Sequence, residues 1–312
     1  MQLHGIHHLT AVSADARGNH DFYTRILGMR MVKKTVNQDD VSAYHLFYAD
    51  GQASPGTDIT FFDWPTPRET RGTNSIVRTA LRVNGRAALD YWAARLAEFK
   101  VPHGAVEEAD GRLELAFEDF EGQRLALIDD GGAGPAHPWE RGPVPAEHQI
   151  RGLGPITMSV ANPNQSDTFA TKVMAMRLDR VVEGADGITT RVYAMGEGGP
   201  AAELHMRVEP NLPRHQPGAG SVHHVAFRVR DDEYDYWVKR FETLGLRSSG
   251  PVDRYYFRSL YVREPSGILY EIATDGPGFA TDEAMDALGE RLSLPPFLEQ
   301  RRAEIERGLK PL

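Results

Sequence analysis

The chain has 312 residues, and its 35 Lys and Arg against 44 Asp and Glu give a formal net charge of −9. This charge argues against a nucleic-acid binder, which normally gathers excess Lys and Arg on one face. The absence of cysteine excludes disulfides, thiolate metal sites and cysteine nucleophiles. No apolar run approaches the roughly 18 residues that span a membrane, and the polar N-terminal sequence does not resemble a signal peptide. We therefore expect a soluble, cytoplasmic protein of about two domains, with no membrane or nucleic-acid partner.

A segment rich in Gly and Pro, residues 131–149, divides the sequence near its midpoint. Such a composition is incompatible with a regular helix or a central strand, so we interpret the segment as a linker. It would separate residues 1–130 from residues 150–275, each containing a pair of modules. Residues 276–312 follow as a tail, and the pattern of residues 297–309 predicts a helix packed on the surface.

Each half divides again into two units with the same order of elements. Apolar segments at residues 6–12, 76–83, 156–160 and 222–229 are predicted leading strands. Each precedes a helix-like stretch and then two or three strand-like stretches, and the helices of units two and four share the pattern Tyr-Trp-x-x-Arg. The matching order predicts an α+β fold of four tandem β-α-β-β-β modules.

Two adjacent pairs of histidines are the most informative residues. His7-His8 lies near the start of the first leading strand, and His223-His224 lies near the start of the fourth. Adjacent side chains of a strand point to opposite faces, so one His of each pair can face a central cavity. If units one and four share a half, two imidazoles can converge on one metal.

An oxygen ligand is expected near the end of unit four. The sequence Glu-Pro-Ser-Gly-Ile-Leu-Tyr-Glu-Ile-Ala, residues 264–273, predicts a tight turn and then an apolar strand that contains Glu271. A carboxylate inside an apolar strand is costly to bury unless it is paired or binds a metal. A single His is more often structural and a single strand Glu usually faces solvent, but their joint occurrence favours a metal site.

The remaining positions suggest that there is only one such site. Arg78-Thr79 and Thr157-Met158 stand in units two and three where the outer units have their His pairs. Asp63, which follows two Phe residues, is not counted as a ligand. The other eight of the 12 histidines are interpreted as structural or surface residues: His4, His20, His45, His103, His137, His148, His205 and His215.

Several motifs resemble those of the vicinal oxygen chelate superfamily, also called the glyoxalase, bleomycin-resistance and extradiol dioxygenase superfamily. The most specific are residues 5–10 (Gly-Ile-His-His-Leu-Thr), residues 44–50 (Tyr-His-Leu-Phe-Tyr-Ala-Asp), Pro55-Gly56-Thr57 and the pair at 223–224. Within the superfamily, the chain is most similar to the ring-cleaving dioxygenases that open hydroquinones, over nearly its whole length. The resemblance implies two barrel-like halves built from the four modules, plus the C-terminal helical tail.

The resemblance also implies a set of metal ligands. In that family the second His of each pair and the late Glu bind iron(II), which corresponds here to His8, His224 and Glu271. Manganese(II) suits the same ligands and remains an alternative. The first His of each pair, His7 or His223, would lie beside the ligands or in the substrate pocket.

Three further residues are carried over from the family as catalytic residues: Arg254, Tyr261 and Thr10. Tyr255 and Tyr256 are alternatives to Tyr261 for the same role, because the match of residues 253–261 to the family motif can shift by one residue.

The expected chemistry follows from this ligand set. Two imidazoles and one carboxylate leave about three positions of iron(II) open, so a substrate hydroxyl and dioxygen can bind side by side. His7 or His223 would accept the phenol proton, Arg254 would stabilise the anion and Tyr261 would donate a hydrogen bond to a ring oxygen.

The predicted function is therefore ring cleavage of a hydroquinone-type or related phenolic substrate by dioxygen. The alternatives are a glyoxalase-like metal-dependent isomerase or lyase, which usually has more carboxylate ligands, and a non-catalytic binding protein of the same fold. The sequence leaves the ring substituents and a homo-oligomeric state open.

Overall fold

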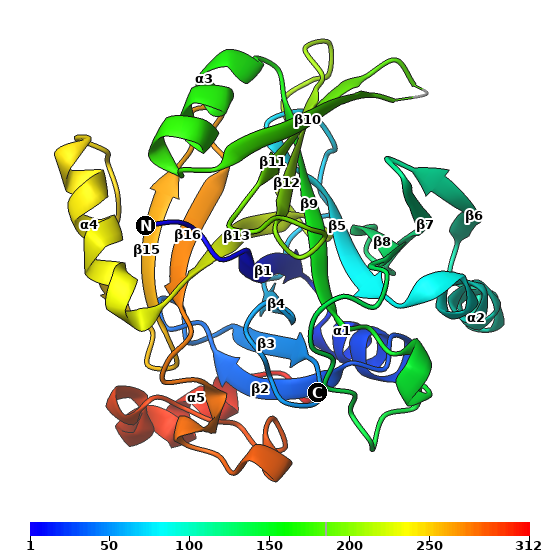
Figure 1. Cartoon of the computed structure of the whole chain (residues 1–312). Helices are drawn as coiled ribbons and strands as arrows, with labels where there is room; N and C mark the ends of the chain where they lie inside the picture. The colour runs from blue at the N-terminus through cyan, green and yellow to red at the C-terminus, as the bar shows by residue number, and fades with distance from the viewer. Residues whose placement is uncertain (185) are drawn as a thin grey trace.

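The computed structural model describes residues 1–184 and 186–312. The strands form two curved eight-stranded sheets, and helices lie along the outside of both (Figure 1). The α+β fold with four repeated modules and two barrel-like halves is confirmed. Within the described residues, no helix combines the length and the apolar character needed to cross a membrane.

The first sheet combines units one and four, in the order β14-β15-β16-β13-β1-β4-β3-β2. Unit one contributes β1 (Ile6–Ser13), β2 (Arg30–Val36), β3 (Tyr44–Ala49) and β4 (Asp58–Asp63). Unit four contributes β13 (Val222–Val229), β14 (Val252–Asp253), β15 (Arg258–Arg263) and β16 (Leu269–Thr274). The central strands β1 and β13 pair antiparallel, so the prediction that the two outer units share one half is confirmed.

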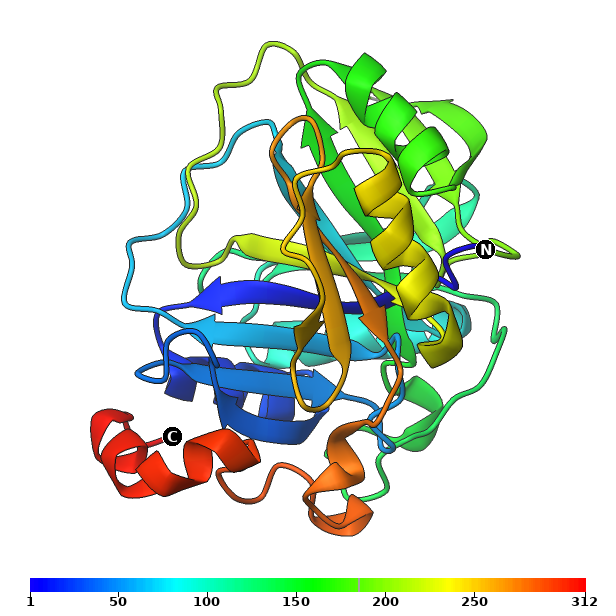
Figure 2. The same ribbon diagram turned by 90° about the vertical axis from the view of Figure 1, so that its left-hand side faces the viewer.

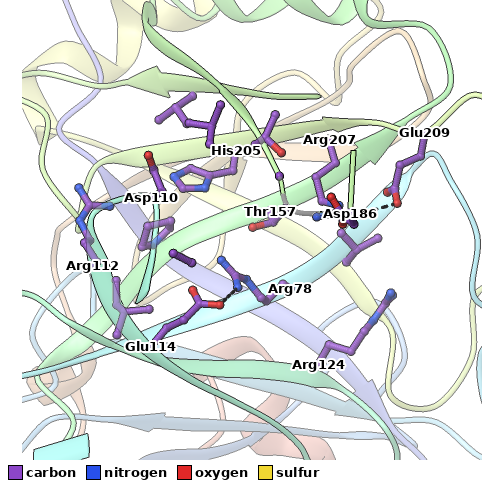
Figure 3. Close-up of a pocket in the computed structure, with 18 of the residues that line it drawn as sticks. Arg78, Asp110, Arg112, Glu114, Arg124, Thr157, Asp186, His205, Arg207 and Glu209 are labelled. Carbon is purple, nitrogen blue, oxygen red and sulfur yellow. Dashed lines mark hydrogen bonds and ion pairs between the residues drawn. The ribbon is translucent and has the colours of Figure 1, made fainter. Parts of the chain in front are cut away.

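The second sheet combines units two and three, in the order β10-β11-β12-β9-β5-β8-β7-β6. Unit two contributes β5 (Ser75–Val83), β6 (His103–Ala109), β7 (Arg112–Glu118) and β8 (Arg124–Asp129). Unit three contributes β9 (Gly152–Val160), β10 (Arg177–Glu183), β11 (Thr189–Ala194) and β12 (Glu203–Val208). Its concave face encloses a cavity of about 800 Å³ (Figure 3).

Each unit has a helical segment between its first and second strands. In unit one these are α1 (Ala16–Asp21) and the π-helix η1 (Phe22–Ile26), and in unit three α3 (Pro163–Thr168) and the π-helix η3 (Phe169–Val173). Units two and four have single α-helices, α2 (Gly85–Glu98) and α4 (Tyr234–Thr243), the latter preceded by the short 3₁₀ helix η4 (Asp231–Glu233).

The Tyr-Trp-x-x-Arg pattern has a structural role in α2 and α4. Its tryptophans, Trp92 and Trp237, are fully buried in the core. Arg95 donates to the carbonyl of Ile26 at 2.8 Å, and Arg240 donates in the same way to the carbonyl of Val173 at 2.8 Å. Because the last carbonyls of a helix have no partner within it, each arginine caps the helix of the preceding unit.

The tail is fastened to β2 at one end of the first sheet (Figure 2). Lys33 is completely buried and donates to Asp282 at 2.7 Å, and it also pairs with Glu283. The predicted helix at residues 297–309 is a 3₁₀ helix, η7 (Pro296–Arg301), followed by α5 (Arg302–Gly308). Its apolar side chains pack on Val36 of β2. The other short 3₁₀ helices are η2 (Ala146–His148), η5 (Phe279–Thr281) and η6 (Met285–Ala287).

Candidate metal centre

Three predicted ligands meet on the concave face of the first sheet. His224 Nε2 lies 2.9 Å from Glu271 Oε2 and 3.4 Å from His8 Nε2. His8 Nε2 lies 3.2 Å from the same carboxylate oxygen. The three residues come from β13, β16 and β1, so units one and four both contribute to this cluster.

Strand register explains why these side chains meet. His8 lies opposite Ala226 of β13, and Ala226 lies opposite Glu271 of β16. Thr10, two residues after His8, lies opposite His224. Side chains of directly opposed residues share a face of the sheet, so the alternation of each strand brings the three donors to one place.

The chemistry of the three donors fits a bound cation. All three side chains are buried, and Glu271 is completely inaccessible to solvent. Neither of its carboxylate oxygens has a partner with hydrogen-bond geometry among the described residues. Burial raises the pKa of Glu271, but the neighbouring His8 and His224 lower it further and keep the group ionised. A buried, ionised carboxylate without hydrogen-bond donors is costly, and a metal ion would remove that cost.

The first histidine of each pair lies behind its neighbour in the cluster. His7 Nδ1 is 2.9 Å from His8 Nδ1, and His223 Nδ1 is 2.8 Å from His224 Nδ1. If His8 and His224 offer their Nε2 lone pairs to a cation, each must carry its proton on Nδ1 and donate it to the partner histidine. Burial lowers the pKa of both His7 and His223 to about 3, which keeps them neutral acceptors.

These two histidines do not line the pocket in front of the cluster. His7 borders a separate cavity of about 150 Å³, and His223 borders another of about 500 Å³.

The pocket in front of the cluster measures about 50 Å³. Arg254 and Tyr261 both line it, as expected for substrate contacts, and the Tyr261 ring stands edge-on to the His224 ring at 5.7 Å between centroids. Tyr256 also lines the pocket, with its hydroxyl donating to Asp282 at 2.9 Å, whereas Tyr255 does not line it. Phe257 covers the ring of His8 at 5.2 Å.

The loop at residues 37–43 closes one side of this pocket. Arg254 Nη2 donates to Asp39 Oδ2 at 2.8 Å, and Gln38 donates to the backbone carbonyl of Arg254 at 2.8 Å. Burial lowers the pKa of Arg254, but its bond to Asp39 raises it further, so the guanidinium stays charged. These contacts join the loop between β2 and β3 to Arg254 in the pocket wall.

His45 is a pocket-lining residue that the sequence analysis interpreted as structural or surface and did not place near the cluster. Its ring lines the pocket, and its Nε2 is 2.9 Å from Thr60 Oγ1, which in turn is 2.8 Å from Thr10 Oγ1. Thr10 is therefore connected to the pocket through Thr60 and His45. Burial places the pKa of His45 well below its usual range. Alternation along residues 44–49 was the available signal, because Phe47 shares the face of His45 and also lines the pocket.

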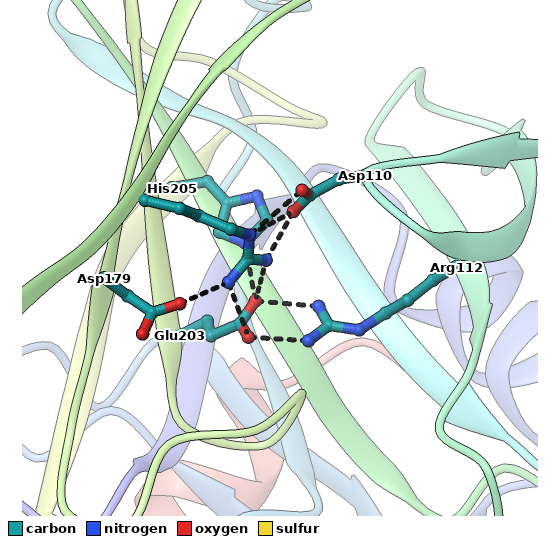
Figure 4. Close-up of polar contacts among 6 residues, drawn as sticks. Asp110, Arg112, Asp179, Glu203 and His205 are labelled. Carbon is teal, nitrogen blue, oxygen red and sulfur yellow. Dashed lines mark hydrogen bonds and ion pairs between the residues drawn. The ribbon is translucent and has the colours of Figure 1, made fainter.

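A second group of acidic and histidine side chains, Asp110, Glu203 and His205, lies in the other half (Figure 4). Arg112 donates to both oxygens of Glu203 at 2.7 and 2.6 Å, and His205 Nε2 lies 2.9 Å from Glu203 Oε2. Arg180 pairs with Asp110 and also contacts Glu203. Burial raises the pKa of Glu203, but these neighbours lower it far more. Because guanidinium groups already satisfy the carboxylates, this cluster is an ion-pair network.

Comparison with known proteins agrees with this architecture. The model of the glyoxalase/bleomycin resistance protein/dioxygenase superfamily matches residues 5–127 and 152–272. A Bacillus subtilis protein named "Putative ring-cleaving dioxygenase MhqA" is 47% identical over the whole of both chains. A chlorohydroquinone/hydroquinone 1,2-dioxygenase of Sphingobium indicum is 32% identical over 99% of this chain and 96% of its own length.

A solved structure extends the likeness to three dimensions. The crystal structure named as a "putative dioxygenase" from Bacillus subtilis superposes with a TM-score of 0.90 at 34% identity, covering 100% of this chain and 98% of that one. With two family matches that together span both halves, the chain belongs to the glyoxalase/bleomycin resistance protein/dioxygenase superfamily.

Proposed function

We propose that the protein is an iron(II)-dependent dioxygenase that cleaves the ring of a hydroquinone-type or related phenol. The convergence of His8, His224 and Glu271 in front of an aromatic pocket is the observation that carries this proposal. Two imidazoles and a carboxylate are the ligand set that non-haem iron(II) oxygenases use. The names of the full-length relatives point to the same reaction class.

His8, His224 and Glu271 would hold the metal, and manganese(II) would suit the same donors. Bound iron(II) would supply adjacent sites for the substrate oxygen and dioxygen and a route for electrons between them. His7 and His223 would keep the ligand rings in the required tautomer by accepting the Nδ1 protons. This bond would use the single lone-pair nitrogen of each neutral ring, so His7 and His223 would orient the ligands and would not take the phenol proton.

Arg254 and Tyr261 would bind the substrate oxygens. The Arg254 guanidinium cannot lose its proton and suits a phenolate. Burial raises the pKa of Tyr261, so its hydroxyl remains protonated and can donate a hydrogen bond to a ring oxygen.

The chain from His45 through Thr60 to Thr10 would give the pocket a hydrogen-bond acceptor. The low pKa of His45 keeps its imidazole neutral, so a ring nitrogen can accept a hydrogen bond from the substrate hydroxyl, although burial also makes the ring a weak base. His45 packs against Phe47 and Phe62, with ring centroids 4.0 and 4.4 Å away. The aromatic walls would hold the flat substrate ring and exclude water.

Substrate entry would require the pocket to widen, and the loop at residues 37–43 forms one of its sides. A dry engineered cavity of about 150 Å³ holds one benzene, whereas this pocket measures about 50 Å³. Breaking the contact between Arg254 and Asp39 would enlarge the pocket and free the guanidinium for the substrate. The same movement would therefore admit the ring and release the group that recognises it.

The test is an oxygen-electrode assay of protein loaded anaerobically with iron(II) or manganese(II). Hydroquinone, chlorohydroquinone and catechol would be the substrates, and the hemithioacetal of methylglyoxal and glutathione would test the isomerase alternative. We expect oxygen uptake with a hydroquinone and a ring-opened acid as the product. Isomerisation of the hemithioacetal without oxygen uptake would overturn the proposal, as would metal-independent binding of the phenols without turnover.

A matched set of variants tests the ligand assignment. His8→Ala and His224→Ala are each expected to lose bound metal while keeping the far-ultraviolet circular dichroism of the wild type. His215→Ala is a suitable control, because His215 pairs with Glu69 away from the cluster. Wild-type metal content in both ligand variants would show that the metal lies elsewhere.

A further inference from the structure

A cavity of about 500 Å³ adjoins the candidate metal centre on the side of His223. It lies between the first sheet and the two connections that join the halves, residues 64–74 and 209–221. Short bridges such as that between Thr70 and Gln216 hold these connections side by side (Figure 2). Ligand cavities commonly measure about 300–1,000 Å³, so this one has room for a small organic molecule.

The lining of this cavity carries positive charge. Arg214 and Arg263 line it, and no Asp or Glu is among the described residues that do so. Arg263 donates through Nη1 to the carbonyl of Gly267 at 2.8 Å. A Cβ atom added to Gly267 would lie 3.5 Å from Arg214 Nη2. Both guanidinium groups therefore lie beside the turn at Gly267.

Neither guanidinium has an ion-pair partner within the part of the chain that the structure describes. The acidic groups nearby in the sequence are engaged elsewhere, because Glu69 pairs with His215 at 2.9 Å and Glu264 accepts from Ser166 at 2.7 Å. Neither of these carboxylates lines the cavity. Two cations held beside one turn repel each other, and an anion bound there would be attracted by both.

His223 offers a hydrogen-bond donor to the same cavity. Its Nδ1 lies 2.8 Å from His224 Nδ1, and it accepts the proton of that atom if His224 binds a cation through Nε2. A neutral imidazole carries one proton, so the proton of His223 is then on Nε2. That nitrogen has no hydrogen-bond partner among the described residues, and the ring lines the cavity. Burial and His224 lower the pKa of His223 most, and Arg263 lowers it further, so this guanidinium lies within electrostatic reach of the ring.

The corresponding cavity of unit one contains carboxyl groups that the chain itself supplies. It lies beside His7 and is lined by Asp58 and Asp275. Asp58 is aligned with His8 in the pairing of β1 with β4. The tail also covers this cavity, in part through Phe279, and the space measures only about 150 Å³.

The cavity of about 500 Å³ lacks both carboxyl groups. Leu269 is aligned with His224 in the pairing of β13 with β16, so it stands where unit one has Asp58. Continuing the same two alignments to the ends of the strands places Trp64 at the position of Asp275. A carboxylate at this place would therefore have to come from a bound molecule.

The rest of the lining suits a flat apolar body. Trp64 lines the cavity and stacks on Phe62, with the ring centroids 4.7 Å apart. Ile76, Val222 and Ile268 line the same space. Ligand sites commonly combine such apolar walls with a few polar groups that fix the orientation of the ligand.

We propose that this cavity binds a small organic carboxylate with a flat apolar body, and that the bound acid strengthens metal binding by His224. Arg214 and Arg263 would pair with the carboxylate, and His223 Nε2 would donate a hydrogen bond to it. Carboxylates behind metal-bound histidines orient the rings and make them stronger ligands, and a chain of hydrogen bonds can transmit this effect. The effect on the metal rests on the proposed ligand set but does not depend on ring cleavage.

Calorimetric titration of the metal-free full-length protein with sodium benzoate tests the site. We expect saturable binding that is up to about fivefold weaker in Arg214→Met and in Arg263→Met, the factor that corresponds to an ion pair at an exposed position. Both arginines are exposed, so neither variant should change the melting temperature. Arg86→Met is the matched control, because Arg86 is an exposed helix residue that pairs with Asp90. Arg254→Met should also bind benzoate as the wild type does.

Electron paramagnetic resonance of manganese(II) measures the effect on the metal without turnover. Saturating benzoate should lower the manganese(II) dissociation constant of the wild type by about fivefold or more, and by linkage the metal should strengthen benzoate binding by the same factor. The double variant of Arg214→Met and Arg263→Met should show no such change at the same benzoate concentration, which excludes direct coordination of benzoate to the metal. A crystal grown with 4-bromobenzoate should show the anomalous signal of bromine beside Trp64.

Five results would overturn the proposal. These are no benzoate binding by the wild type, unchanged binding by both single arginine variants, weaker binding by Arg254→Met, a manganese(II) dissociation constant that benzoate does not lower, and a bromine signal outside this cavity. None of these measurements needs dioxygen or turnover. Failure of the proposed ring cleavage would therefore appear in the oxygen-electrode assay alone and is distinguishable from failure of this site.

Discussion

Replacing Glu271 by Gln should change protein stability in opposite directions with and without metal. In the metal-free protein, the variant removes a completely buried carboxylate whose oxygens have no hydrogen-bond donors. The new amide can donate to the Nε2 atoms of His8 and His224, which lie within 3.2 Å of Glu271 Oε2. Removing a buried, unsatisfied charge should raise the free energy of unfolding by about 1–3 kcal/mol. For a chain of this size that corresponds to a rise of roughly 2–4 °C per kcal/mol in the melting temperature.

With bound metal, the wild type should be more stable than Glu271→Gln. A metal at 100 times its dissociation constant stabilises the wild type by about 2.7 kcal/mol, whereas Glu271→Gln has lost its only charged ligand and should gain much less. The assay is thermal unfolding at pH 8, above the ordinary histidine pKa of about 6.5, with chelator or with anaerobic iron(II). The control is Glu299→Gln, because Glu299 is exposed. Glu264→Gln is unsuitable because Glu264 accepts several hydrogen bonds. If Glu271→Gln is destabilised without metal and shows the wild-type metal shift, the carboxylate is not a ligand.

Three further outcomes follow from the site and the core. Arg254→Met and Tyr261→Phe should keep normal iron but turn over at least about tenfold more slowly, equivalent to roughly 1.4 kcal/mol of transition-state stabilisation; unchanged turnover in both would remove them from the site. Asp39→Asn should speed substrate association in stopped-flow experiments by up to about fivefold, which corresponds to the free energy of an exposed ion pair. Asp40→Asn should leave the association rate unchanged. Equal rates for both variants would show that the contact between Asp39 and Arg254 does not gate entry. Burial raises the pKa of Asp119 from 3.8 to about 6, so the folded state holds this proton more tightly than the unfolded state does. The free energy of unfolding of the wild type, relative to Asp119→Asn, should therefore fall by up to about 3 kcal/mol as pH rises from 4 to 7. A pH-independent difference in melting temperature would contradict this.

The repeated units and the convergence of His8, His224 and Glu271 could be predicted because each has a recognisable local sequence pattern. The strand predicted at residues 222–229 coincides with β13 (Val222–Val229), and the doubled histidines mark equivalent strands. Glu271 stands out because a carboxylate is rare inside an apolar strand. In these cases the chain's short-range pattern carries the information.

His45 and Asp39 could not be placed in this way. Alternation places His45 on the same strand face as Phe47, but only the pairing of β3 with β4 shows that this face lies at the pocket, where the His45 ring reaches Thr60. Asp39 is exposed and lies in a loop, and its contact with Arg254 joins residues that are 215 positions apart. Strand alternation, in contrast, already predicts that one histidine of each pair faces away from the cavity, and these are His7 and His223.

The pairing of the first unit with the last has a consequence for how the protein is made. The second half is one continuous stretch, from β5 to β12, so it can fold during synthesis as soon as it leaves the ribosome. The first sheet cannot be completed around β1 until β13 and β16 have been translated. A truncated product that ends before β16 would carry both metal-facing histidines and still lack the carboxylate. Binding of an ion by all three proposed donors would therefore show that translation has passed Glu271.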